Sequence, residues 1–243
     1  MRGGAGSPLA SDAPAAPSAA AARGARRRER TRRALLEAAR EVIGEKGIDA
    51  ATIGEIAERA DVGFGSFYNH FGTKDDLVDA LLEDAVVGHR EVIDTSNLAF
   101  SRPAELLANA TYLTVHQAAV DPLWGWIVLR LGTGRLDLVA PLMVGLERDV
   151  REGIAAGDFA DASPELLMAV VAGSVLAAMG GRLTGTLVAQ DEWLFVESVL
   201  RQVGLTPHAA RSTVRRVQAA RTPMTRPLSH HHPSPGEVPP CDS

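Results

Sequence analysis

Apolar residues recur every three or four positions along most of this chain, and this spacing restricts it to helices. One stripe is formed by Leu35, Ala38, Ala39, Val42 and Ile43. β-branched residues nowhere alternate with polar ones over the length of a strand. We therefore predict an all-α fold, with helices over about residues 31–46, 53–60, 63–70, 74–96, 103–120, 122–131, 137–156, 164–185, 191–204 and 207–219.

Three prolines directly follow a residue that caps helices, in Asp121-Pro122, Ser163-Pro164 and Thr206-Pro207. Proline is tolerated at the first helical position because its missing N–H has no partner there, and Asp, Ser and Thr accept hydrogen bonds from the free amides. These pairs predict three helix starts. Prolines are also dense at the C-terminus, and we interpret residues 221–243 as a disordered Pro/His-rich tail.

Charge is distributed unevenly along the chain. Residues 76–205 carry 18 acidic and 8 basic residues, whereas seven arginines lie between Arg23 and Arg33. A basic run of this kind suits a polyanion, although a solvated segment without a partner has the same composition. Because the chain before it is rich in Ala, Gly, Ser and Pro, we interpret residues 1–27 as a disordered basic arm.

Several classes of protein and site are excluded by what the sequence lacks. The single cysteine, Cys241, allows no disulfide framework, and His230, His231 and His232 lie in the Pro-rich tail without the fixed geometry of a metal site. No run of 18 apolar residues and no signal peptide is present, so we expect a cytoplasmic protein with no membrane partner. No nucleophile elbow, zinc-protease motif or phosphate loop occurs, so we expect no enzyme and no cofactor.

Residues 52–71 combine two short helices with a tight turn. Thr52 and Glu55 form a capping box that begins the first helix. In the second helix, Phe67 and Phe71 lie four residues apart and can pack inward, which leaves Ser66, Tyr68, Asn69 and His70 facing outward. This arrangement fits a helix-turn-helix whose second helix enters the major groove of DNA.

The next helix begins directly after this segment. Thr73 is its expected N-cap, and Asp76 takes the capping-box position. Lys74 lies in the first turn, where a lysine and free backbone amides together can hold a phosphate.

Residues 28–88 resemble the DNA-binding domain of the TetR family of transcriptional regulators. The resemblance rests on Arg33–Ala39, Gly47, Thr52–Ala57, Val62–Phe71, Thr73-Lys74 and Leu77. It implies that Ser66, Tyr68, His70 and Lys74 contact operator DNA, chiefly through phosphates, and that Thr52 is a phosphate-contacting cap. It also implies that positions 54, 63, 64 and 65 help to read bases. Gly54, Gly63, Phe64 and Gly65 occupy these positions, where better-known members often have polar side chains. Phe64 can press on thymine methyl groups, and the glycines allow close approach.

The resemblance further implies that residues 89–220 form a helical domain for ligand binding and dimerisation. The helices over 164–185 and 191–204 would form the homodimer. The first of these is apolar nearly all round and carries small residues at Ala169, Gly173, Ala177 and Gly180, which permit close helix contact.

Candidate ligand-binding residues lie on the helices before this pair. Asn109, Tyr112 and His116 share one helix face, and Trp124, Trp126, Arg130, Met143 and Met168 supply bulky or soft side chains on neighbouring helices. Each is also consistent with an ordinary core or surface position. We expect a small, mostly apolar effector that lowers DNA affinity. The alternative is a ligand-independent DNA-binding regulator whose C-terminal half only dimerises, and a closed apolar cavity would distinguish the two.

Overall fold

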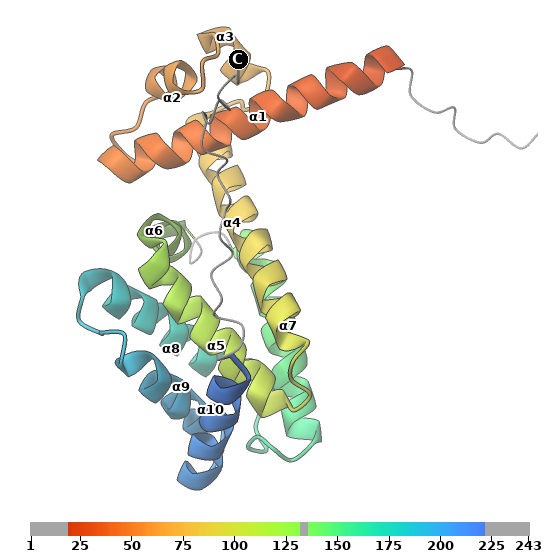
Figure 1. Ribbon diagram of the computed structural model, residues 1–243, viewed down its shortest axis with the longest axis vertical. Helices are drawn as coiled ribbons and strands as arrows, with labels where there is room; N and C mark the ends of the chain where they lie inside the picture. Colours follow the sequence, from red (N-terminus) through yellow and green to blue (C-terminus); the bar gives the residue numbers. More distant parts are fainter. Residues whose placement is uncertain (1–18, 132–135, 222–243) are drawn as a thin grey trace, which may run out of the picture. The chain divides into compact units, whose positions relative to one another are not determined.

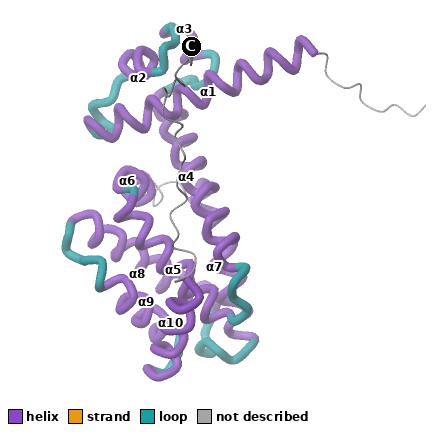
Figure 2. Tube along the Cα trace, viewed as in Figure 1, coloured by secondary structure: helices purple, strands orange, loops and turns teal. Residues whose placement is uncertain are grey.

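The computed structural model describes residues 19–131 and 136–221, and every regular element in these ranges is a helix (Figures 1 and 2). The helices are α1 (Ala19–Lys46), α2 (Ile53–Arg59), α3 (Phe64–Tyr68), α4 (Lys74–Asn97), α5 (Pro103–Val120), α6 (Pro122–Leu131), α7 (Leu136–Ala155), α8 (Pro164–Thr184), α9 (Asp191–Gln202) and α10 (Pro207–Arg221). The predicted all-α class is confirmed.

The three cap-proline pairs begin helices as expected. The Trp124 N–H donates to Asp121 Oδ1 at 3.0 Å at the start of α6. The Leu166 N–H donates to Ser163 Oγ at 3.2 Å in α8, and the Ala209 N–H donates to Thr206 Oγ1 at 3.3 Å in α10. Each capping side chain thus satisfies an amide that has no partner inside the helix.

The first helix is longer than the sequence pattern predicted, and this corrects the interpretation of residues 1–27. Residues 19–27 are helical and form the first turns of α1, rather than a disordered arm. The physical reason is composition, because Ala and Arg are among the strongest helix formers and the last proline before the run is Pro17. Residues 1–18 and the predicted tail from residue 222 onward lie outside the described residues.

The chain divides into two compact units between Leu81 and Leu82, inside α4 and before the expected boundary at residue 88. In the first unit α1 packs on α2, and α2 packs on α3. Its core consists of buried apolar residues from all four helices, including Leu35, Val42, Ile56, Phe67 and Leu77. Leu35 and Val42 belong to the predicted stripe, and Phe67 was expected to pack inward, so hydrophobic burial accounts for the arrangement of the short helices.

In the second unit α5 packs against each of α6, α7, α8, α9 and α10, as Figure 1 shows. The last turn of α7 requires a glycine, because a Cβ on Gly153 would lie 2.2 Å from the Phe159 ring. Phe159 itself is buried in the core formed by α5, α8, α9 and α10.

The face of α8 that is not packed on α5, α6, α7 or α9 is formed by small and apolar residues. Leu166 is 57% exposed, and Ala169, Gly173 and Ala177 are exposed on the following turns. Among the described residues α8 is long and apolar enough to cross a membrane by length and composition alone. Four packed neighbours and an open stripe of small residues account for that composition equally well.

Candidate nucleic-acid interface and ligand cavity

The turn between α2 and α3 is fixed by hydrogen bonds at both ends of α2. The predicted capping box is present, because Thr52 Oγ1 accepts from the Glu55 N–H at 3.3 Å and the Thr52 N–H donates to Glu55 Oε2 at 3.2 Å. At the other end the Val62 N–H donates to the Ala57 oxygen at 3.0 Å, with Asp61 in the left-handed region at a φ of 53°. This bond closes the helix in the manner of a Schellman motif and sets the direction in which α3 begins.

The short helix α3 has a buried side and an exposed side. Phe67 and Phe71 are buried as expected, with their ring centroids 5.7 Å apart. On the outer side Phe64 is 56% exposed and Tyr68 is 50% exposed, and their rings meet edge to face at 5.5 Å. Gly63, Gly65 and Asn69 are also exposed, whereas Ser66 and His70 are half-buried. An exposed aromatic pair beside two glycines is unusual for a solvated surface and suits close approach to another molecule.

Arginines of α1 lie beside the end of α3. The Arg28 guanidinium donates to the Asn69 backbone oxygen at 3.0 Å, and Arg32 lies over the Phe71 ring with its guanidinium carbon 5.5 Å from the centroid. Burial, and then these two positive charges, lower the pKa of His70. The imidazole is therefore neutral near pH 7, and the positive charge beside α3 comes from the arginines.

Lys74 has a structural role that the sequence did not predict. Its ammonium nitrogen donates to the backbone oxygens of Ile48 at 2.6 Å, Ala51 at 2.8 Å and Asp49 at 3.3 Å. These oxygens belong to the loop between α1 and α2, so Lys74 ties the start of α4 to that loop. An ammonium has three N–H donors, and all three are used.

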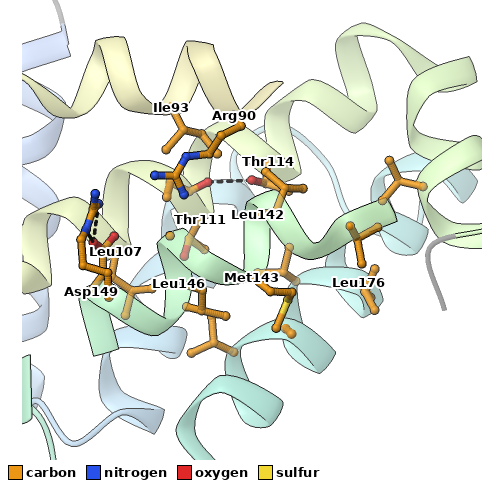
Figure 3. Close-up of a pocket in the computed structure, with 18 of the residues that line it drawn as sticks. Arg90, Ile93, Leu107, Thr111, Thr114, Leu142, Met143, Leu146, Asp149 and Leu176 are labelled. Atoms are coloured by element: carbon orange, nitrogen blue, oxygen red, sulfur yellow. Dashed lines mark hydrogen bonds and ion pairs between the residues drawn. The ribbon is translucent and has the colours of Figure 1, made fainter. Parts of the chain in front are cut away.

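A cavity of about 370 Å³ lies within the second unit (Figure 3). Its walls come from α4, α5, α6, α7 and α8 and are mainly apolar, with Ile93, Leu107, Val128, Leu142, Met143, Leu146, Val171, Val175, Leu176 and Met179 among the lining residues. A cavity of this size and lining suits a small organic molecule.

The polar groups of this cavity are few, and the charged ones are paired. The Arg90 Nε donates to Asp94 at 2.7 Å, and the guanidinium crosses α7 at Gly145, where a Cβ would lie 1.5 Å from it. Arg148 Nη2 donates to Asp149 at 2.6 Å, and the Asp149 carboxylate is buried. Burial raises the pKa of Asp149, an effect that the hydrogen bond from Arg148 partly offsets. Each charge in the wall is thus met by an opposite one.

The sequence matches two family descriptions, one over each unit. Residues 35–81 match bacterial regulatory proteins of the tetR family, and residues 102–216 match the tetracyclin repressor-like C-terminal domain. Among solved structures, RolR in complex with resorcinol shares 30% sequence identity, with a TM-score of 0.64, over 79% of this chain and 96% of that one. The chain belongs to the TetR family.

Curated relatives match only part of this TetR-family chain. The transcriptional repressor Rv3405c of Mycobacterium tuberculosis is 37% identical over 83 residues, 34% of this chain and 42% of the relative. The repressor KstR2 of Rhodococcus jostii is 33% identical over 85 residues, 33% of this chain and 41% of the relative. The chain therefore spans less than half the length of these relatives. The family matches over both units identify the chain as a bacterial regulatory protein.

Except for Met143, the expected ligand residues of this regulator lie away from the cavity. Leu107, Ala110, Thr111 and Thr114 are the cavity-lining residues of α5. At 100° per residue, the face formed by Asn109, Tyr112 and His116 is opposite to theirs. These aromatic side chains pack against one another and do not line the cavity, since the Tyr112 ring stacks on Trp193 at 4.1 Å and on His116 at 5.2 Å between ring centroids.

Most of the other predicted ligand residues are packed in the core or exposed at the surface. Trp124 is buried and its indole N–H donates to the Ala85 oxygen at 3.1 Å, while Trp126 and Arg130 are exposed. Met168 is packed against the core formed by α5, α8, α9 and α10. Of the residues singled out from sequence, Met143 alone lines the cavity. As for metals, the described residues contain no cluster of His, Cys, Asp or Glu that could hold one, and His230, His231, His232 and Cys241 lie outside the described ranges.

Sequence reasoning missed the polar residues of the cavity, namely Arg90, Asn97, Thr111, Thr114, Arg148 and Asp149. One available signal was Arg148-Asp149 within the mainly apolar pattern of α7, because adjacent opposite charges next to an apolar stripe mark a face at the edge of the core.

Proposed function

We propose that this protein is a transcriptional repressor that binds operator DNA as a homodimer and leaves it when a small molecule occupies the cavity of the second unit. The observation that carries DNA binding is the outer side of α3, with Phe64 and Tyr68 exposed beside the α1 arginines. On this proposal, Thr52, Gly63, Phe64, Gly65, Ser66, Tyr68, Asn69, His70 and Lys74 form the contact surface, and the protein acts in the cytoplasm.

The residues of this surface differ in whether they contact bases or phosphates. Phe64 offers an apolar edge to thymine methyl groups and so contributes to base preference. Tyr68 presents a hydroxyl group that suits a phosphate oxygen, and phosphate contacts carry little base information. Lys74 acts first by positioning α4 against the loop before α2, because its donors are already used.

The DNA-binding test is selection of bound duplexes from a random pool, followed by affinity measurements on the selected site. We expect a palindromic or near-palindromic sequence with half-sites roughly one helical turn or slightly more apart. Tyr68→Ala should weaken binding to all sequences alike, with Tyr68→Phe as the control that removes only the hydroxyl. Phe64→Ala should change the selected bases. Full-affinity binding of a monomer to an isolated half-site would contradict the proposal.

Ligand release is supported by the cavity and its lining. An apolar wall with Thr111, Thr114 and a buried Asp149 suits a small, neutral, mostly apolar molecule with one or two hydrogen-bonding groups. RolR, whose structure contains resorcinol, is a relative with a ligand of this type. The cavity also favours a sensor over the alternative of a regulator whose second unit only dimerises.

The ligand test uses resorcinol and related small phenols as probes of operator release. A ligand that prefers the non-binding conformation by about 1–3 kcal/mol lowers DNA affinity about 5- to 150-fold. Ala172→Phe places a ring in the cavity, so it should abolish the response while operator binding remains. Ala219→Phe, an exposed position on α10, is the matched control. An unchanged response of the Ala172→Phe protein would mean that the ligand binds elsewhere.

A further inference from the structure

Asn97, the last residue of α4, is the one residue in the described parts of the chain with a buried side-chain polar atom that lacks a hydrogen-bond partner. The residue is 7% exposed and lines the cavity. Its Oδ1 accepts from Asn109 Nδ2 at 2.8 Å, whereas its Nδ2 has no partner within the described ranges. A buried donor left unpaired is costly, so such a group calls for a partner outside the chain.

The orientation of this amide is set by a relay that starts at the end of α10. The Arg221 guanidinium can only donate, and its Nη1 lies 2.6 Å from Asn109 Oδ1. The oxygen of Asn109 therefore faces Arg221, and its nitrogen faces Ser96 Oγ at 3.0 Å and Asn97 Oδ1. If the Asn97 amide were reversed, two NH₂ groups would face each other. The atom left without a partner is thus the donor Nδ2 of a residue that lines the cavity.

Arg221 is itself held firmly in place. Its guanidinium carbon lies 4.7 Å from the centroid of the Tyr112 ring, and Tyr112 stacks on Trp193 at 4.1 Å. Burial lowers the pKa of Arg221, yet an arginine remains charged at neutral pH. Asn109 and Tyr112, which the sequence placed at the ligand, therefore act behind the cavity wall.

We propose that Asn97 Nδ2 is a ligand-binding group and that the effector carries a hydrogen-bond acceptor, a carbonyl or ether-type oxygen, at the end of the cavity near α4. This inference rests on the proposed ligand-release function and specifies the chemistry of the ligand. The effector is neutral, because the charges in the cavity wall are paired as Arg90 with Asp94 and Arg148 with Asp149. Arg221 and Asn109 are positioning residues that hold Asn97 Oδ1 and so leave Nδ2 as the free donor.

The experiment compares two probes of nearly equal shape, acetophenone and isopropylbenzene, by isothermal titration calorimetry on the full chain. They differ in that a methyl group replaces the carbonyl oxygen. Their hydrophobicities also differ, so the measured quantity is the ratio of their dissociation constants, compared between wild type and Asn97→Leu. One hydrogen bond of ordinary net strength predicts that the relative preference for acetophenone falls about 2- to 12-fold in the variant.

A second variant tests the relay without altering the cavity wall. Arg221→Met keeps the apolar stem over Tyr112 but removes the donor that orients Asn109, so it should reduce the same ratio. Arg215→Met, an exposed position on the same helix, should leave the ratio unchanged. If Asn97→Leu does not fold, as judged by circular dichroism, Arg221→Met still decides the question.

The outcomes separate this inference from the proposed function. Equal ratios in wild type, Asn97→Leu and Arg221→Met overturn the role of Asn97 while leaving the cavity as a ligand site. Binding of isopropylbenzene without binding of acetophenone overturns the role of Asn97 as well. If neither probe binds and Ala172→Phe leaves resorcinol release unchanged, the cavity is not the ligand site and both proposals fail.

Discussion

At the scale of single residues, Lys74 shows how one side chain can hold two segments of the first unit together. Its ammonium group donates to three backbone oxygens of the loop between α1 and α2. Lys74→Met keeps the apolar stem and removes the donors, so we expect the free energy of unfolding to fall by about 1–2 kcal/mol. Lys46→Met is the matched control, since Lys46 forms an exposed ion pair with Glu55 whose loss should cost less than the loss of the Lys74 hydrogen bonds. Chemical denaturation measures both, and equal losses would contradict the structural role of Lys74.

His89 provides a prediction for pH at the same scale. Burial lowers its pKa to about 4, and its Nε2 lies 3.0 Å from Thr114 Oγ1 beside the Trp124 ring. Between pH 6.5 and 4 the unfolded chain binds a proton at His89 that the folded chain does not, so the stability that this residue contributes is full above pH 6.5 and is lost as pH falls toward 4. The loss should approach about 3 kcal/mol.

The measurement for His89 is the difference in unfolding free energy between wild type and His89→Gln across this pH range, because carboxylates titrate there too. His208→Gln, at an exposed position on α10, should follow the wild type at every pH. A pH-independent difference for His89→Gln would show that His89 titrates normally in the fold.

At the scale of helices, the sequence predicted what depends on local chemistry. Thr52 with Glu55, and Thr73 with Asp76, define helix starts within four residues, and both reciprocal pairs are present in the structure. The start of α1 was not predicted, because a run rich in Ala and Arg does not show where helix formation begins. The cavity wall was missed for another reason. Hydrophobic spacing gives the face of a helix but not the distance between helices, and that distance decides where medium-sized residues such as Leu142 and Leu146 leave space.

The helical start of α1 gives a prediction for DNA binding. Arg23, Arg26 and Arg27 are exposed on a helix, so their charges have fixed places near the phosphates on our proposal. We expect replacement of all three with Gln, a good helix former, to leave the selected sequence unchanged. The slope of the logarithm of operator affinity against the logarithm of salt concentration should become shallower by about 0.9 for each lost phosphate contact. Replacing Arg201 on α9 together with Arg211 and Arg215 on α10, all three exposed, removes the same number of charges and controls for net charge. Deleting residues 1–27 should reproduce the effect. An unchanged salt dependence in both variants would show that this segment makes no phosphate contacts.

At the scale of the whole molecule, the proposed dimer depends on the open face of α8. Leu166, Ala169, Gly173 and Ala177 repeat at three and four positions and therefore share one face, and Leu194 on the neighbouring α9 is 63% exposed. A contiguous apolar face with small residues suits a second copy of the same helices, and two recognition helices held together suit paired half-sites.

Gly173→Glu tests this dimer with little risk to the fold, because a Cβ at Gly173 meets no atom within 4 Å in the single chain. A charged side chain in the middle of an apolar interface has no partner there, so we expect the variant to be monomeric in sedimentation experiments and to lose high-affinity operator binding. Gly88→Glu makes the same change at an exposed glycine of α4 that also has open space around its Cβ, and this protein should remain dimeric. Both variants should keep the helical circular dichroism of the wild type. A dimeric Gly173→Glu protein with normal operator affinity would place the interface on another face and leave the open stripe of α8 without a role in assembly.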